Sequence, residues 1–399
     1  MNEIIDYILS FLLYGDTQAA KRVGYTDDTA LFNQYEVVIT PNHHLGKDLV
    51  YPDFDNTVVE QVGKTHVIHT DIVYNTFFFI SRAEELLNPQ RDEHGRFTAK
   101  NSMLGQDNRL LIPLIDEYAH ILLKLLNLPI PTPHYAHIYL THDVDSIAHY
   151  RHLRGALGGI KRGQIKQVIK ALQNIHQDPA YTFPWLMEQD SQLPNATQIY
   201  FIKSTHGHGH DYPQYCLRGH DYQQLKSTLQ CHHALLGLHS SYYGYLPSSN
   251  LAAALSTDIP NWQYHRSHYL RCSIDQMQCL AKAGVSDDFT MGFPDRIGFR
   301  LQTSRAVRWI NPKTMTLTNL TLHPLTIMDC TLSNANYMNL NEDEAYFSSE
   351  ELLDRVRRYA GEVVLLWHNS IFANVPYQQS LYVKLLKGLR HYSHHEEQE

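Results

Sequence analysis

The sequence predicts an α/β fold built on a parallel sheet, with a smaller α+β module before it. Short apolar runs alternate with helical patterns along residues 131–399, and this alternation is typical of a parallel sheet, closed or open. Residues 1–130 show a different pattern and end in a proline-rich segment. A chain of 399 residues also exceeds what one hydrophobic core usually organises, so we expect two domains with these bounds.

Prolines mark the predicted boundary between the two domains. Pro129, Pro131 and Pro133 follow the helical apolar pattern of residues 115–126. Because proline cannot continue a helix, the first domain is expected to end near residues 128–134.

The amino-terminal module is expected to mix helices, strands and a charged loop. Residues 1–15 carry an apolar stretch interrupted by Asp6, which predicts a short amphipathic helix. Strands are expected around residues 36–40 and 71–80. The charged segment 91–97 predicts a loop whose side chains form ion pairs between the domains.

The second domain shows the strand and helix alternation most clearly near its end. Ser348 and Glu351 have the spacing of a capping box, and Gly361 stands where the following helix would stop. A strand follows at once. The strands expected in this domain are residues 136–140, 197–203, 234–239 and 362–369, with a helix at residues 273–284.

Composition argues against several classes of protein. The formal charge is −8 and no long run of Lys and Arg occurs, so nucleic acid is not expected as the main partner. The five cysteines are scattered and predict reduced, cytoplasmic thiols. No apolar stretch reaches the roughly 20 residues that a membrane span needs, and the start lacks a basic region and a cleavage site. We therefore expect a soluble, cytoplasmic protein; its oligomeric state stays open.

Polar side chains follow several of the predicted strands. Asp143 and Asp145 follow the first strand of the second domain, His239 ends the third, and His368 follows the last. In parallel architectures the chemistry lies at the carboxyl ends of the strands, where the loops converge. We therefore expect these carboxylates and imidazoles to lie close together.

This set of side chains suits the hydrolysis of an unactivated amide. Such a reaction needs a metal that acidifies water and polarises the carbonyl, and a base that removes the proton. Asp145 and His239 are the expected metal ligands, and Asp143 is the expected base. His368 is the expected acid that protonates the leaving amine.

The same residues resemble the motifs of the polysaccharide deacetylase family. THDVD at 141–145 resembles the first motif in its Asp-x-Asp variant, which implies that Asp143 is the base and Asp145 a ligand of a divalent metal. GLHSSYYGY resembles the second motif, whose first histidine matches His239. The metal is expected to be zinc.

Three further motifs follow in the family's order. RSHYLR resembles the third, whose arginine orients the base and matches Arg266. DDFTMGF resembles the fourth, whose aspartate holds that arginine and is best matched by Asp288. VVLLWHNS resembles the fifth, whose histidine is the catalytic acid and matches His368.

The resemblance extends over most of the chain. The motifs spread over residues 136–370, and residues 77–97 resemble a module that accompanies a bacterial branch of the family. The resemblance implies a distorted (β/α)7-type barrel with a smaller amino-terminal α+β module.

One position departs from the family pattern. The second histidine of the usual metal pair falls on Tyr243, whose phenol stays protonated up to about pH 10 and is a poor ligand. Tyr243 is therefore expected to face the substrate or to pack. The third ligand would come from His268, His142 or water.

Together these observations predict a hydrolase of C–N amide bonds that deacetylates an N-acetylated sugar or glycan precursor. Two alternatives stay open: a hydrolase of non-sugar amides, and a degenerate deacetylase that serves as a glycan-binding or scaffolding protein. Histidine is abundant, with 26 copies. The group His206, His208 and His210 is expected to form a solvated loop, with metal binding as the alternative.

Overall fold

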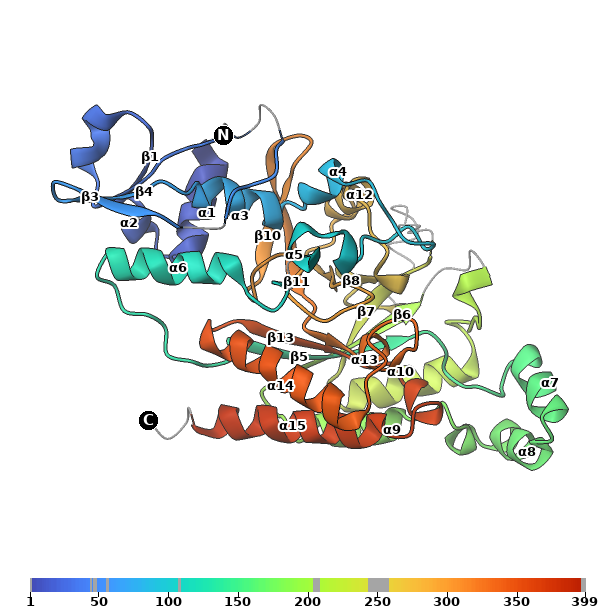
Figure 1. The fold of residues 1–399 in the computed structure, drawn as a ribbon. Coiled ribbons are helices and arrows are strands. Elements are labelled where there is room, and N and C mark those ends of the chain that lie inside the picture. Colours follow the sequence, from blue (N-terminus) through green and yellow to red (C-terminus); the bar gives the residue numbers. More distant parts are fainter. Residues whose placement is uncertain are drawn as a thin grey trace.

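Two sheets with helices packed around them make up the molecule (Figure 1). The computed structural model describes residues 2–43, 45, 49–54, 57–106, 109–203, 209–242 and 258–395. Among these residues, no helix combines the length and the apolar character needed to cross a membrane.

The amino-terminal part of the chain contains, within the described residues, a small four-stranded sheet with the order β1-β2-β4-β3. Its strands pair in parallel except for β3 and β4, which are antiparallel. Its strands are β1 (Val23–Tyr25), β2 (Val37–Ile39), β3 (Val59–Val62) and β4 (Thr65–Ile68). Its helices are α1 (Asn2–Leu12), α2 (Thr17–Ala20), η1 (Thr29–Gln34), α3 (Ile72–Ile80), α4 (Glu84–Leu87), η2 (Ala99–Asn101), α5 (Met103–Gln106) and α6 (Leu114–Leu125).

The prediction of a strand at residues 71–80 is wrong, because this segment forms helix α3. The Asp71 side chain caps the helix by accepting a hydrogen bond from the backbone N–H of Tyr74 at 2.9 Å. All nine residues of α3 are buried, so the helix is apolar on every side. A uniformly apolar run has no periodicity that separates a buried helix from a buried strand, which explains the error.

Among the described residues, the larger sheet has nine strands in the order β10-β11-β9-β8-β7-β6-β5-β13-β12. Neighbouring strands are parallel except for β10 and β11. The predicted α/β class is thus confirmed as a mixed sheet with helices. The strands are β5 (His137–Val144), β6 (Thr197–Lys203), β7 (Leu235–Ser240), β8 (Tyr264–Ser267), β9 (Asp287–Met291), β10 (Val307–Asn311), β11 (Thr316–Pro324), β12 (Ile327–Met328) and β13 (Glu362–Leu366).

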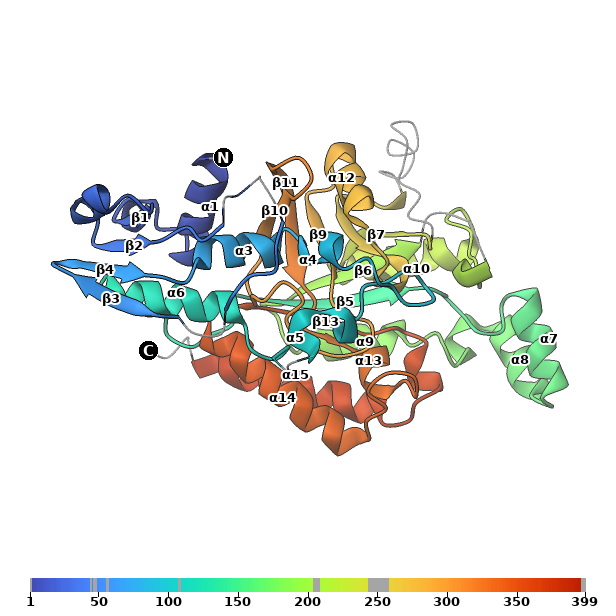
Figure 2. The same cartoon turned by 45° about the horizontal axis from the view of Figure 1, so that its top comes forward.

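Helices flank this sheet, and two of them, α14 and α15, run side by side along it (Figure 2). Helix α14 begins earlier than predicted: the capping box consists of Asn341 and Glu344 rather than Ser348 and Glu351. The described helices of this part are α7 (Leu153–Lys161), α8 (Ile165–Gln173), η3 (Ile175–Gln177), α9 (Phe183–Asp190), η4 (Gly209–Asp211), α10 (His220–Cys231), η5 (His268–Leu270), α12 (Ile274–Ala283), α13 (Asp329–Ser333), α14 (Glu342–Arg358), η6 (Ile371–Ala373) and α15 (Gln378–His395).

Packing and buried charge join the amino-terminal part of the chain to the larger sheet. One hydrophobic core contains both Phe77 of α3 and Trp309 of β10. The buried carboxylate of Glu85 pairs with Arg82 at 2.8 Å and with Arg300 of the second part at 2.7 Å. Because removing one partner of a buried ion pair leaves an uncompensated charge, these contacts fix the module against the sheet.

A buried histidine draws distant strands of the large sheet together. His323 of β11 contacts Glu362 of β13 at 2.7 Å and Asp287 of β9 at 3.0 Å. Its ring also stacks on Phe289 with a centroid distance of 4.3 Å. Strands β11 and β13 are far apart in the sheet order, so this contact requires the sheet to curl.

The His323 contacts should make stability fall at alkaline pH. Burial lowers the pKa of His323, but Asp287 and Glu362 outweigh it and raise the pKa to about 9. A raised folded-state pKa gives stability that is complete below the unfolded value near 6.5 and is lost as the pH rises through about 9. The pairing is worth on the order of 3 kcal/mol.

Urea unfolding should therefore show that the free energy of unfolding falls more between about pH 6 and about pH 10 in the parent than in His323→Gln. The control His220→Gln removes a histidine whose side chain is 87% exposed, so its free energy of unfolding should fall with pH as much as that of the parent. If the free energy of unfolding of His323→Gln fell as much as that of the parent, the imidazolium of His323 would not be the cause of the pH dependence.

Candidate functional site

The carboxyl ends of three strands deliver the polar side chains that the sequence singles out. Strands β7, β6, β5 and β13 are consecutive and parallel in the sheet, so their ends meet on one edge. Asp143 lies on β5 with Asp145 just beyond it, His239 lies on β7, and His368 follows β13. The structure thus brings together the expected base, ligands and acid.

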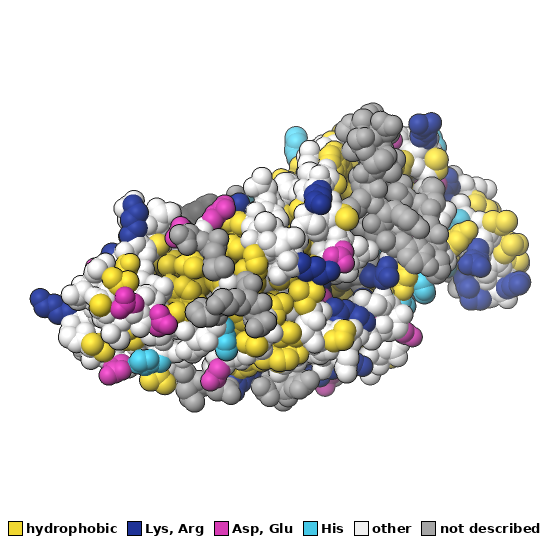
Figure 3. Space-filling model, turned by 90° about the horizontal axis from the view of Figure 1, so that it is seen from above, with side chains coloured by type: hydrophobic (Ala, Val, Ile, Leu, Met, Phe, Trp, Pro, Cys, Tyr) yellow, Lys and Arg dark blue, Asp and Glu magenta, His cyan; other side chains and the backbone are white. Residues whose placement is uncertain are grey.

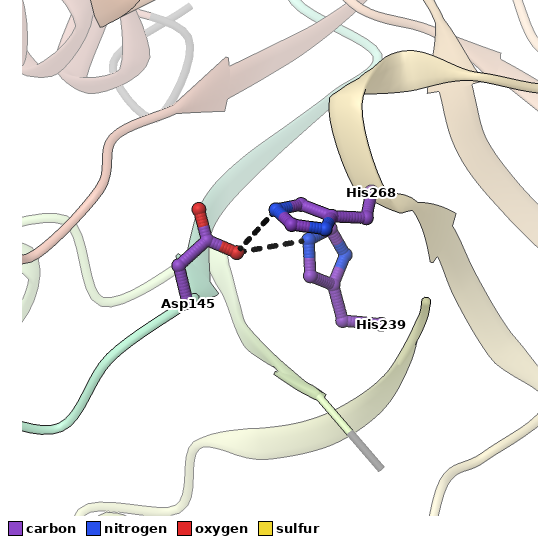
Figure 4. A group of neighbouring side chains, drawn as sticks. All are labelled: Asp145, His239 and His268. Carbon is purple, nitrogen blue, oxygen red and sulfur yellow. Dashed lines mark ion pairs between the residues drawn. The ribbon is translucent and has the colours of Figure 1, made fainter. Parts of the chain in front are cut away.

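Asp145, His239 and His268 form a group that could hold a metal ion (Figure 4). The Oδ1 atom of Asp145 lies 3.3 Å from Nε2 of His239 and 3.1 Å from Nε2 of His268. One ligand atom from each residue lies within 4.8 Å of the other two. His268 thus stands where a third ligand was expected, whereas Tyr243 lies outside the described residues.

Hydrogen bonds orient both imidazoles of this group. Nδ1 of His239 donates to the backbone carbonyl of Arg266 at 3.0 Å, and Nδ1 of His268 donates to the Asp211 carboxylate at 3.0 Å. A proton on Nδ1 leaves Nε2 free as a ligand, which is the usual arrangement around a protein-bound metal. The positions of Nε2 toward Asp145 therefore suit coordination.

Two buried atoms of this group have no hydrogen-bond partner among the residues that the structure describes. They are Nε2 of His239 and Oδ1 of Asp145, and they face one another. Unpaired buried polar atoms are costly, and a cation between them would satisfy both. Burial raises the pKa of Asp145, but His268 and His239 outweigh it and hold the pKa well below its ordinary value. The residues therefore fit a divalent metal with nitrogen and oxygen ligands.

A buried lysine forms hydrogen bonds with the loops next to the candidate metal ligands. Nζ of Lys203, at the end of β6, donates to the carbonyls of Asp145 at 2.7 Å, Asp211 at 2.8 Å and Pro213 at 3.2 Å. These bonds fix the backbone of one ligand and of the carboxylate that orients another. Lys203 thus positions the group without belonging to it.

Arg266 holds the Asp143 carboxylate from behind. Its Nη1 donates to Oδ1 of Asp143 at 3.0 Å and to Oγ1 of Thr141 at 2.8 Å. Burial raises the pKa of Asp143, but His239 and Arg266 outweigh it, so the pKa lies below its ordinary value. The carboxylate is therefore ionised and can accept a proton.

The partner of Asp288 differs from the one expected. Asp288 was expected to hold Arg266, but its Oδ2 accepts a hydrogen bond from Nδ1 of His265 at 2.7 Å and from Oγ1 of Thr290 at 2.8 Å. The Nε atom of Arg266 donates instead to the carbonyl of Phe289. Residues on β8 alternate between faces, so His265 and Arg266 point to opposite sides and Asp288 reaches only the first.

His368 is fixed by Asp329, a residue that the sequence reasoning missed. Nδ1 of His368 donates to Oδ1 of Asp329 at 2.9 Å, and the backbone N–H of His368 donates to Oδ2 at 2.7 Å. Burial lowers the pKa of His368, but Asp329 outweighs it and raises the pKa well above its ordinary value. His368 is therefore held as an imidazolium that can donate a proton.

Asp329, Cys330 and His368 form a second group with possible metal ligands. Here the carboxylate is already satisfied by His368. Burial also raises the pKa of the Cys330 thiol to about 11, so the thiolate that a metal prefers is disfavoured. We interpret this group as a hydrogen-bonded pair beside a neutral thiol.

A pocket of about 380 Å³ opens over both groups. Asp143, Asp145, His268 and His368 all line it. Its walls also include Tyr212, Tyr269, Tyr337 and Arg96.

Arg96 brings the amino-terminal module into the pocket wall. The charged segment 91–97 was expected to form ion pairs between the domains, but Asp92 and Arg96 pair with each other at 2.7 Å. The contacts of this segment with the second part of the chain include a hydrogen bond of 2.9 Å from Arg96 to the hydroxyl of Tyr337 and one of 2.8 Å from Arg271 to the carbonyl of His94. In the sequence, the only signal for the role of Arg96 in the pocket wall was the high number of charged residues in segment 91–97.

Two other histidine predictions concern His142 and the group of His206, His208 and His210. His142 was one possible ligand, but its ring nitrogens contact the Trp367 carbonyl at 3.0 Å and the Asp190 carboxylate at 2.9 Å. His206 and His208 lie outside the described residues, whereas His210 lines the pocket and stacks on Tyr242.

Comparisons with known proteins give partial likenesses. Residues 2–131 match DUF7033, a family of unknown function. No curated protein matches the chain. The chain is similar to the structure of a candidate polysaccharide deacetylase from Mycobacterium smegmatis, with 14% identity and a TM-score of 0.42 over 66% of this chain and 86% of that one. It is also similar to a candidate polysaccharide deacetylase involved in O-antigen biosynthesis from Bordetella bronchiseptica, with 11% identity and a TM-score of 0.27 over 63% and 83% of the two chains.

The candidate metal group can be tested by zinc titration of the metal-free protein. Asp145→Ala and His268→Ala should each weaken zinc binding at least tenfold, because each removes one of three ligands. Asp211→Asn should weaken it by about 10- to 100-fold, because it removes the acceptor that orients His268. His220→Ala removes an exposed histidine and should leave the affinity unchanged. Equal affinity in the parent and the two ligand variants would place the metal elsewhere.

Proposed function

We propose that this protein is a metal-dependent amide hydrolase that removes the acetyl group from an N-acetylated sugar or glycan precursor. The observation that carries the proposal is that Asp145, His268, the Arg266-bound Asp143 and the Asp329-bound His368 all line one pocket, with His239 in contact with Asp145. Zinc is the proposed metal, since the ligand set is nitrogen and oxygen.

The proposal includes a finer view of the fold and of its parts. The curled sheet with its helices would be a distorted (β/α)7-type barrel, residues 131–399, and residues 1–130 would be a module that closes one side of its pocket. Support comes from Arg96, which lines the pocket and bonds Tyr337 across the two parts.

The proposed reaction divides the proton transfers between the two fixed side chains. A divalent metal bound by Asp145, His239 and His268 would acidify water and polarise the amide carbonyl. Asp143 accepts the proton of the attacking water as its oxygen bonds to the carbonyl carbon. His368 donates a proton to the amide nitrogen as the C–N bond breaks. The products are acetate and a free amine.

Charge and position suit these two roles. Arg266 compensates the buried charge of Asp143, so the carboxylate is oriented toward the ligand His239, whose Nε2 lies 3.6 Å from Oδ2. Asp329 compensates the imidazolium of His368. A base and an acid held in opposite protonation states are what amide hydrolysis requires.

The pocket walls support a sugar as the substrate. Tyr212, Tyr269 and Tyr337 contribute broad rings that carry a hydroxyl at one end. Such rings offer both an apolar face and a hydrogen-bonding group, which matches the two kinds of surface on a sugar.

Replacing the base should stop turnover without removing the metal. Asp143→Asn keeps the size of the side chain but cannot accept the proton, so acetate release from N-acetylglucosamine derivatives should fall about 100-fold or more. Zinc content should stay at the parent level. Acetate release at the parent rate would show that Asp143 is not the base.

Replacing the acid should affect substrates according to their leaving group. His368→Ala should slow the release of a poorly leaving amine far more than that of an activated phenol from an acetyl ester, which leaves without a proton. The measurement is kcat/KM for an N-acetylated sugar and for the ester. Equal losses on both substrates would remove the acid role from His368.

A further inference from the structure

Helices α7 and α8 form a hairpin that projects from one end of the molecule (Figures 1 and 2). Each helix exposes three large aliphatic side chains with the spacing i, i+4, i+7, which places them on one stripe of the helix. The exposed fractions are 78% for Leu153, 50% for Leu157, 46% for Ile160, 51% for Ile165, 49% for Ile169 and 51% for Leu172.

The opposite faces of the two helices are already used for packing. Gly159 of α7 lies so close to Val168 of α8 that a Cβ on the glycine would stand 2.5 Å from a methyl carbon. Val168 and Ala171 are buried against Tyr150. The exposed aliphatic stripes are therefore a second apolar surface that the fold itself does not cover, although such residues usually occupy a core.

Positive charge borders both stripes. The hairpin from residue 153 to residue 173 contains five cationic side chains and no Asp or Glu, in a chain whose formal charge is −8. The five are Arg154, Lys161, Arg162, Lys166 and Lys170, all exposed. None of them forms an ion pair with a carboxylate of the described residues. Four of them directly follow a residue of an aliphatic stripe, which places them along its edge.

We propose that the α7–α8 hairpin binds an anionic lipid surface. An apolar stripe bordered by Lys and Arg is the pattern of helices that lie in the membrane interface, with the stripe among the acyl chains and the cations at the headgroups. Each Lys or Arg near an anionic membrane strengthens binding by about fivefold. A space-filling view shows apolar and basic side chains side by side at the hairpin end (Figure 3).

The hairpin also contacts one residue of the pocket wall. The guanidinium of Arg154 lies 5.5 Å from the ring centre of Tyr212, and Tyr212 lines the pocket that contains Asp143 and His368. Binding through the hairpin would therefore bring the pocket close to the lipid surface. The lipid binding itself does not depend on the proposed deacetylation.

Cosedimentation with vesicles tests this proposal. The full chain should pellet with vesicles of phosphatidylcholine and phosphatidylglycerol, and should bind at least tenfold more weakly to phosphatidylcholine alone or in high salt. The double variants Leu157→Ser with Ile169→Ser, and Lys166→Glu with Lys170→Glu, should each lose at least tenfold in affinity for the anionic vesicles.

Matched controls come from the two long carboxyl-terminal helices. Phe347→Ser changes an apolar side chain that is 66% exposed on α14, and Lys387→Glu reverses an exposed charge on α15; both should bind like the parent. Circular dichroism shows whether each variant is folded.

The proposal is overturned if the parent does not bind anionic vesicles or if the hairpin variants bind them as well as the parent does. It is equally overturned if the stripes instead hold two copies together, seen as a dimer in sedimentation that Leu157→Ser with Ile169→Ser dissociates.

Discussion

The candidate site depends on the buried residue Arg266, because its side chain and its backbone together connect five strands of the sheet. From β8 it bonds Asp143 and Thr141 of β5, and the carbonyl of Phe289 on β9. It lies over the Phe201 ring of β6, and its own carbonyl receives Nδ1 of His239 on β7. A fully buried cation must be compensated, which explains the ionised state of Asp143. The backbone carbonyl of the same residue orients His239.

Much of the site follows from the sequence because its parts lie at strand ends. Asp143, Asp145, His239 and His368 each belong to a short strand pattern, and parallel strands carry such residues to one edge. Arg266 was found through its motif. Asp329 was missed because it starts a short helix far from His368 along the chain, and no local pattern links the two. Contacts of this kind arise only when the sheet brings distant segments together.

Errors in the fold have similar physical origins. The segment of α3 is apolar on every side, so its period could not distinguish a helix from a strand. The start of α14 was set too late because Ser348 and Glu351 have the capping spacing, whereas Asn341 and Glu344 form the cap that the chain uses. Both pairs fit the spacing of a capping box, and the tertiary packing of the helix determines which pair forms the cap.

The proposed function requires that a divalent metal binds at the Asp145, His239 and His268 group, in which His268 would supply the third ligand. Anomalous X-ray scattering at the zinc edge, from crystals of the full chain grown with zinc, tests this most directly. The account predicts a strong peak bonded to Asp145, Nε2 of His239 and Nε2 of His268, with Asp143 and His368 on the pocket side of the ion. A peak bonded instead to Asp329, Cys330 and His368, or the absence of any peak between Asp145 and His239, would contradict it.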